Sequence, residues 1–166
     1  MNFQTRLIAT IGAVAMLSAS ASAFAMEAWD FGALAYGSKI TAAPSWAKDY
    51  SCDDDGGCAF YDPKGVRYVT WQGDVVVKTF EVSPTNRKSI PFGINYDDSS
   101  KAVISTVALK TGKTFQCDTQ KENPNIKPGL TYCSTVVTEG EVPTFLTLRF
   151  GRDDKLQEIE LYTAYL

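Results

Sequence analysis

Four cysteines constrain the fold of this chain more than any other feature of its sequence. They stand at Cys52, Cys58, Cys117 and Cys133. An even number of cysteines in an exported chain indicates disulfides, and four cysteines allow three connectivities. We expect local pairing, Cys52 with Cys58 and Cys117 with Cys133. A zinc site or a redox pair is the alternative, but the chain has neither CxxC spacing nor any histidine, so we expect no metal and no cofactor.

The N-terminal residues have the pattern of a secretory signal peptide. A short region with the basic Arg6 is followed by an apolar stretch from Leu7 to Leu17. Ala23-Phe24-Ala25 then matches the motif that signal peptidase recognises, and Ala21-Ser22-Ala23 is a second candidate. The apolar stretch is shorter than the ~20 residues that span a bilayer. We therefore predict a cleaved signal peptide over 1–25 and a bacterial periplasmic or secreted product without membrane insertion.

Composition excludes several classes of function. The chain has 166 residues, with 16 basic and 19 acidic side chains, no histidine and a net charge of −3. Because it has no basic run, it offers nucleic acid no electrostatic footprint. Because it has no histidine, it cannot form a Ser–His or Cys–His nucleophile. The candidates for an acid pair are Glu139, Glu141, Glu158 and Glu160, but the alternation of the last two is typical of a solvated strand face, so we expect no enzyme activity.

The rest of the chain divides into two related halves. Leu34-Ala35-Tyr36-Gly37 and Ile90-Pro91-Phe92-Gly93 share an apolar-x-aromatic-Gly pattern. Each precedes a helical stretch, a cysteine pair and two strands joined by a polar turn, and chance similarity is the alternative to a true repeat. The polar segment 83–89 suits a linker. We predict a first αβ unit over 26–82, the linker at 83–89 and a second αβ unit over 90–166.

The predicted elements define an α+β fold. One helix is expected from the caps Asp98 or Ser99 to Gly112, and a short one from Thr41 to Asp49. β-branched and aromatic residues predict strands at 58–61, 66–71, 75–82, 131–137, 144–150 and 156–163. We therefore expect tandem helix-plus-antiparallel-sheet units, closed by disulfides, with helices on one face and the other face open to water or a partner.

The twofold order of aromatic-Gly, helix, cysteine pair and hairpin resembles the β-lactamase inhibitor protein family. It also resembles the wider superfamily that includes the BamE (SmpA) lipoproteins, although no lipobox cysteine is present. The residues that carry the resemblance are Phe92-Gly93, Val103, Val107, Cys117, Cys133, Phe150 and the strand from Leu156 to Leu161. The resemblance implies tandem αβ units whose sheets form a concave protein-binding surface. It also implies an acidic residue after the first cysteine pair, for which Asp62 is the candidate.

An acidic loop is the first candidate contact with a partner. Asp53, Asp54 and Asp55 lie between Cys52 and Cys58. A calcium loop needs ligands at alternating positions and a downstream glutamate, so consecutive aspartates do not fit a metal site. A solvated turn is the alternative to partner contact.

Aromatic residues of the next hairpin are the second candidate. They are Tyr61, Tyr68 and Trp71, beside Asp62. Alternation along a strand places Tyr68 and Trp71 on opposite faces, so both cannot be core residues. An exposed Tyr or Trp there is typical of a protein-interface hot spot, and core packing is the alternative.

These features together predict an exported bacterial protein-binding domain. We expect a proteinaceous inhibitor or immunity protein that blocks an envelope-targeted enzyme, such as a cell-wall hydrolase, a toxin or a β-lactamase. The alternatives are an envelope-assembly or scaffolding factor and a small-ligand carrier, which would need an apolar pocket between helices and sheet.

Overall fold

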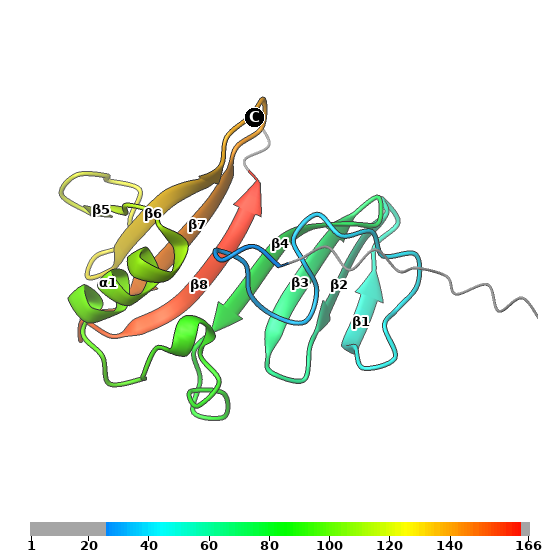
Figure 1. Ribbon diagram of the computed structural model, residues 1–166, viewed down its shortest axis with the longest axis horizontal. Coiled ribbons are helices and arrows are strands. Elements are labelled where there is room, and N and C mark those ends of the chain that lie inside the picture. The colour runs from blue at the N-terminus through cyan, green and yellow to red at the C-terminus, as the bar shows by residue number, and fades with distance from the viewer. Residues whose placement is uncertain (1–25, 164–166) are drawn as a thin grey trace, which may run out of the picture.

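The computed structural model describes residues 26–163, so the predicted signal peptide lies outside the described residues. These residues form a single antiparallel sheet of eight strands with order β1-β2-β3-β4-β8-β7-β6-β5 (Figure 1). The strands are β1 (Lys48–Cys52), β2 (Gly57–Tyr61), β3 (Val66–Trp71), β4 (Asp74–Glu81), β5 (Gln116–Thr119), β6 (Thr131–Thr138), β7 (Thr144–Phe150) and β8 (Leu156–Thr163). A 3-10 turn, η1 (Pro91–Gly93), and one helix, α1 (Ser100–Thr111), complete the described elements.

The sheet consists of two four-stranded meanders that are joined edge to edge. Strands β1 to β4 follow one another in space, and so do β5 to β8. The last strands of the two meanders pair antiparallel, with Phe80 of β4 opposite Ile159 of β8. The molecule is therefore dominated by one continuous sheet, whereas we had expected two helix-plus-sheet units.

The helix predicted over 41–49 is wrong. Residues 41–47 form turns and bends, and β1 already begins at Lys48. Pro44 has no N–H to donate, and only a few residues separate it from Cys52, which the disulfide holds beside β2. A segment this short gains little free energy from helix propagation, so strand pairing with β2 is the more stable structure.

The helix of the second half is confirmed with the predicted ends. The Ser99 hydroxyl accepts a hydrogen bond from the Ala102 N–H, and Gly112 closes the helix with a left-handed φ of 66°. Val103 and Val107 are its buried side chains. Their spacing of one helical turn places both against the sheet.

One layer of residues covers one face of the sheet. Helix α1 and the N-terminal segment lie on the same side, in front of the strands in Figure 1. Beneath them is one hydrophobic core that crosses the junction between the meanders and includes Phe60, Tyr68, Phe80, Val103, Val107, Leu146, Leu148, Ile159 and Leu161. In the first half, residues 29–47 take the covering position that α1 has in the second, with Trp29, Leu34, Tyr36 and Trp46 packed on the core.

Both predicted disulfides are confirmed. Cys52 bonds Cys58, and Cys117 bonds Cys133. Each joins residues that face one another across an edge strand and its neighbour, β1 with β2 and β5 with β6. The disulfides therefore hold the two short polar edge strands, β1 and β5, in the sheet. The sequence pattern did not predict these two strands.

Candidate functional site: the open face of the sheet

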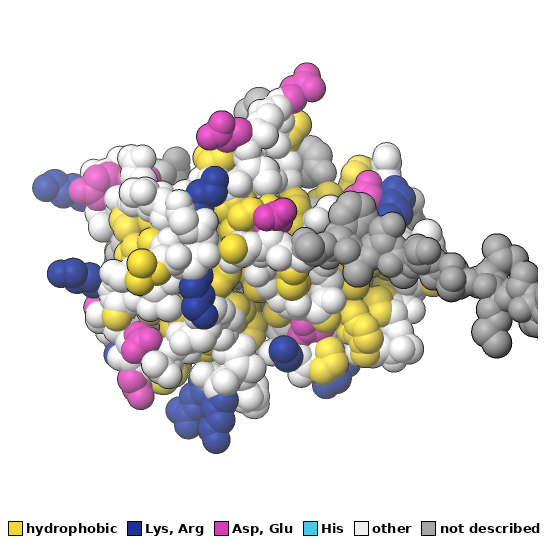
Figure 2. Space-filling model, in the orientation of Figure 1, with side chains coloured by type: hydrophobic (Ala, Val, Ile, Leu, Met, Phe, Trp, Pro, Cys, Tyr) yellow, Lys and Arg dark blue, Asp and Glu magenta, His cyan; other side chains and the backbone are white. Residues whose placement is uncertain are grey.

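The sheet has a second face that no described segment covers, and we call it the open face. Along β3, Val66, Tyr68 and Thr70 are buried under the covering layer, whereas Arg67, Val69 and Trp71 point the other way and are exposed or half-buried. The covered side of the molecule carries charged groups of both signs, scattered rather than gathered by sign (Figure 2). The open face is more distinctive.

An apolar row crosses the open face over six neighbouring strands. Strand register places its members directly opposite one another, in the order Ala59, Val69, Val77, Tyr162, Phe145 and Val136. All six are half-buried, and the rings of Phe145 and Tyr162 stack with centroids 5.6 Å apart. The row crosses the β4–β8 junction, so it exists only because the two meanders form one sheet. Because contiguous apolar surface is typical of interaction sites, this row is the candidate binding surface.

A hollow of about 490 Å³ extends the apolar row at the β2–β4 end of the open face. We call it the Trp71 hollow; its lining residues are Asp53, Gly57, Val69, Thr70, Trp71, Val76 and Val77. Trp71 is 43% exposed, a high value for the largest apolar side chain. Register places Gly57 directly opposite Trp71, and the Asp53 carboxylate lies where a side chain at Gly57 would crowd it.

A polar row runs beside the apolar row. It consists of Arg67, Thr79, Glu160, Thr147 and Ser134, again opposite one another on successive strands. The Glu160 carboxylate has no hydrogen-bond or ion-pair partner among the described residues, while Glu158 pairs with Arg149 at 3.2 Å. Burial raises the pKa of Glu160, the nearby Glu158 charge raises it further, and Arg149 and Arg67 oppose the shift. The centre of the face therefore carries an unpaired carboxylate.

The aromatic candidates divide between the two faces. Tyr61 and Trp71 lie on the open face and are 40% and 43% exposed. Tyr68 is fully buried on the covered face, as expected for a residue an odd number of positions from Trp71. Tyr68 therefore offers no atom to a partner and is a core residue.

Asp62 is also buried, at 2% exposure, and does not project toward a partner as we had expected. Its Oδ1 accepts hydrogen bonds from the Lys64 and Val66 N–H groups at 2.8 and 2.9 Å. Its Oδ2 accepts one from the Tyr68 hydroxyl at 3.1 Å. The carboxylate therefore holds the β2–β3 turn closed, which is the ordinary role of an Asp that starts a turn.

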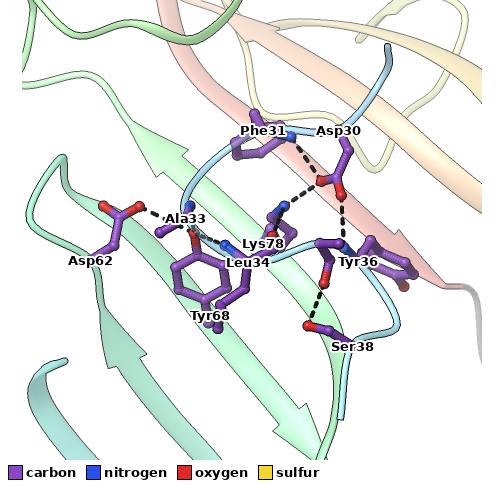
Figure 3. Close-up of polar contacts among 10 residues, drawn as sticks. Asp30, Phe31, Ala33, Leu34, Tyr36, Ser38, Asp62, Tyr68 and Lys78 are labelled. Atoms are coloured by element: carbon purple, nitrogen blue, oxygen red, sulfur yellow. Dashed lines mark hydrogen bonds and ion pairs between the residues drawn. The ribbon is translucent and has the colours of Figure 1, made fainter. Parts of the chain in front are cut away.

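A buried ion pair, missed by the sequence analysis, fastens the covering layer to the first meander. Lys78 of β4 pairs with Asp30, and their side chains are 0% and 2% exposed (Figure 3). Nζ of Lys78 also donates to the Leu34 carbonyl at 2.7 Å. Burial lowers the pKa of Lys78, and the Asp30 charge opposes the shift. The one available sequence signal was that Lys78 is charged, whereas the other buried residues of β4, Val75 and Phe80, are apolar.

The Tyr68 hydroxyl completes this anchoring network. It accepts hydrogen bonds from the Ala33 and Leu34 N–H groups at 2.5 and 3.4 Å, and it donates to Asp62 (Figure 3). A side chain on Gly32, whose φ is 91°, would place its Cβ 2.1 Å from this hydroxyl, so glycine is required there. Burial, followed by the Asp62 charge, raises the pKa of Tyr68. Because its polar atoms are paired with one another, the network stabilises the fold and leaves no group free for chemistry.

The acidic loop is exposed, as the sequence suggested. Asp53, Asp54 and Asp55 all lie at the surface, and Asp53 Oδ1 accepts a hydrogen bond from the Gly57 N–H at 2.7 Å. Within residues 26–163, no three His, Cys, Asp or Glu side chains gather as they would around a metal ion. Only Asp53 of the three lines the Trp71 hollow.

No helix of the described part of the chain has the length and apolar character to cross a membrane. Comparison with family models, with curated proteins and with solved structures finds no match for this chain. Its class is therefore defined by its architecture: a single antiparallel sheet, covered on one side and open on the other.

Proposed function

We propose that this chain is an exported bacterial protein-binding domain that blocks an enzyme of the cell envelope, as a proteinaceous inhibitor or immunity protein. The open face is the surface that binds. The observation that carries the proposal is the apolar row, which crosses six strands on a face left uncovered by residues 26–163. The two disulfides are compatible with a location outside the reducing cytoplasm.

The open face has the composition of a protein interface. Exposed Tyr61 and Trp71 belong to the residue types that dominate binding energy in interfaces. The apolar row supplies the centre, and Arg67, Glu160 and the acidic loop supply polar groups around it, as in the usual arrangement of apolar core and polar rim. Because the side chains of the apolar row stand on strands rather than on flexible loops, little conformational entropy is lost there when a partner binds.

The proposal includes an origin of the fold from two tandem αβ units. Two four-stranded meanders in mirrored order support descent from one duplicated αβ unit, as the resemblance to β-lactamase inhibitor proteins implies. In this interpretation, residues 29–47 and their anchor Lys78–Asp30 replaced the helix of the first unit.

A small-ligand carrier is less well supported. A carrier needs an apolar cavity between helix and sheet. There, Val103 and Val107 of α1 and Leu148 and Ile159 of the sheet are all fully buried in one packed core. The Trp71 hollow opens to the surface instead, which suits a side chain of a partner better than an enclosed small molecule.

The test is capture from envelope extract, followed by an activity assay of the captured enzyme at equal stoichiometry. Val77→Lys places a charge in the middle of the apolar row, and Leu109→Lys is the matched control because Leu109 is an exposed residue of α1 on the covered side, at 85%. We expect Val77→Lys to weaken binding at least tenfold, which corresponds to about 1.4 kcal/mol, and Leu109→Lys to leave it unchanged. A captured partner that is not inhibited would instead identify an assembly factor. Equal binding by wild type and Val77→Lys would refute the assignment of the open face.

A further inference from the structure

The Trp71 hollow combines apolar walls with a single carboxylate whose position is fixed. Two hydrogen bonds join Asp53 and Gly57. The Asp53 N–H donates to the Gly57 carbonyl at 2.8 Å, and the Gly57 N–H donates to Asp53 Oδ1 at 2.7 Å. The Cys52–Cys58 disulfide closes the same loop. The Asp53 carboxylate is therefore held in place in the wall of the hollow that Trp71 also lines.

The absence of a side chain at Gly57 makes room for this carboxylate. A Cβ at Gly57 would lie 2.8 Å from Asp53 Oδ2, so any larger residue would displace the carboxylate. Oδ2 accepts no hydrogen bond from a described residue, whereas Oδ1 is already occupied. One acceptor atom of the hollow is thus left open.

The surroundings of the hollow are acidic. Asp54 and Asp55 are exposed on the same loop. Asp74, which faces Trp71 across β3 and β4, is paired with Lys39 at 3.3 Å. An apolar wall with an excess of negative charge complements a side chain that has an aliphatic stem and a cationic end.

We propose that the Trp71 hollow receives a lysine or arginine side chain from the surface of the partner protein. The stem lies against Trp71 and Val77, and the cation meets Asp53 Oδ2 and the face of the indole. Cations bind tryptophan better than any other aromatic side chain, and arginine stacks on it as well. This site rests on the proposed function, and it specifies that the blocked enzyme presents a basic side chain to the open face.

The test uses three capped tripeptides as probes, acetyl-Gly-X-Gly-amide with arginine, lysine or norleucine at X. Norleucine keeps the aliphatic stem of lysine and lacks the charge. Each is titrated into isotope-labelled protein, purified with its disulfides from cells that express the full chain, and binding is followed by NMR at the Trp71 indole N–H and the Gly57 amide. Trp71→Phe assigns the indole signal.

We expect saturable binding of the arginine peptide with a Kd on the order of 1 mM, and binding of the norleucine peptide about threefold to fivefold weaker. Two variants should abolish the preference for arginine over norleucine. Asp53→Asn keeps an acceptor for the Gly57 N–H but removes the charge, and Gly57→Ala displaces the carboxylate without changing the charge. Asp55→Asn is the matched control, since it removes the same charge from the same loop, and it should keep most of the preference. The spectra and melting curves of the variants show whether each is folded.

Equal affinity for arginine and norleucine, no saturable shift, or an equal effect of Asp55→Asn and Asp53→Asn would each overturn the site. If the peptides do not discriminate and Val77→Lys still abolishes partner capture, the site in the hollow is wrong and the proposed function stands. If the hollow binds arginine through Asp53 while Val77→Lys leaves capture intact, the proposed function fails instead.

Discussion

Removal of Asp30 should destabilise this protein more than any other single loss of a charge that the structure describes. Asp30→Asn leaves Lys78 fully buried without its counter-charge, and only neutral acceptors remain, the amide oxygen of the new side chain and the Leu34 carbonyl at 2.7 Å. Leaving one charge of a buried pair without its partner costs about 3–5 kcal/mol. For a domain of this size each kcal/mol lowers Tm by about 2–4 °C, so we expect a fall of roughly 10 °C.

Lys78→Met should cost less, about 2 kcal/mol, because Asp30 keeps two charge-stabilising donors. These are the N–H groups of Phe31 and Tyr36, each 2.7 Å from the carboxylate. The double variant removes both charges and should be less destabilised than Asp30→Asn alone, since a buried pair adds little net stability over an apolar replacement. The coupling energy of the cycle is therefore expected to be at least about 2 kcal/mol.

Urea unfolding of the four proteins, followed by circular dichroism, measures this coupling. The Asp30→Asn variant should also regain stability as pH rises above neutrality. Burial lowers the pKa of Lys78 in the folded state, and without Asp30 only the weaker effect of the Asp62 charge opposes that shift. The unfolded chain therefore binds more protons, and the stability of this variant increases with pH. Additive effects of the two substitutions, or an Asp30→Asn variant no less stable than Lys78→Met, would refute the account of this pair.

Three further predictions concern other parts of the molecule. Tyr68→Phe removes the hydroxyl shared by Asp62 and two backbone N–H groups, and it should lower the free energy of unfolding by about 1–3 kcal/mol in urea titrations. The pKa of Glu160 is raised, so the folded state holds that proton more tightly, and the contribution of Glu160 to stability falls as pH rises from about 4. Glu160→Gln should therefore match wild type near pH 4 and exceed its stability at neutral pH, and a difference that is constant with pH would contradict this. Replacement of Cys117 and Cys133 by Ser should cost about 3 kcal/mol and should first expose the β5 amides to hydrogen exchange.

Local patterns predicted much of this fold. The ends of α1 followed from Ser99 and Gly112, because capping depends on residues adjacent in sequence. The strands β3, β4, β7 and β8 followed from β-branched and aromatic runs. The polar segments Lys48–Cys52 and Gln116–Thr119 show no such pattern, and they become strands only because a disulfide and a neighbouring strand hold them.

The candidate site was predicted only in part. Trp71 and Tyr61 were identified as surface candidates, and alternation correctly separated Trp71 from Tyr68. Asp62 was misjudged because a turn-forming aspartate and a docking aspartate look alike in sequence. Val77, Tyr162 and Phe145 were not singled out for binding at all, since each looks like an ordinary strand residue until the pairing is known.

The sequence by itself determined the capped helix and the two-sided character of each strand, because these depend on residues close together along the chain. It predicted local disulfide pairing among three possible connectivities, and the structure has that pairing. Tertiary structure alone decided that β4 pairs with β8, in a register that aligns Val77 with Tyr162. That pairing joins segments far apart in the chain, and no local pattern specifies which strand edges meet or with what offset. The open face, and with it the surface on which the proposed function depends, exists only through this long-range choice.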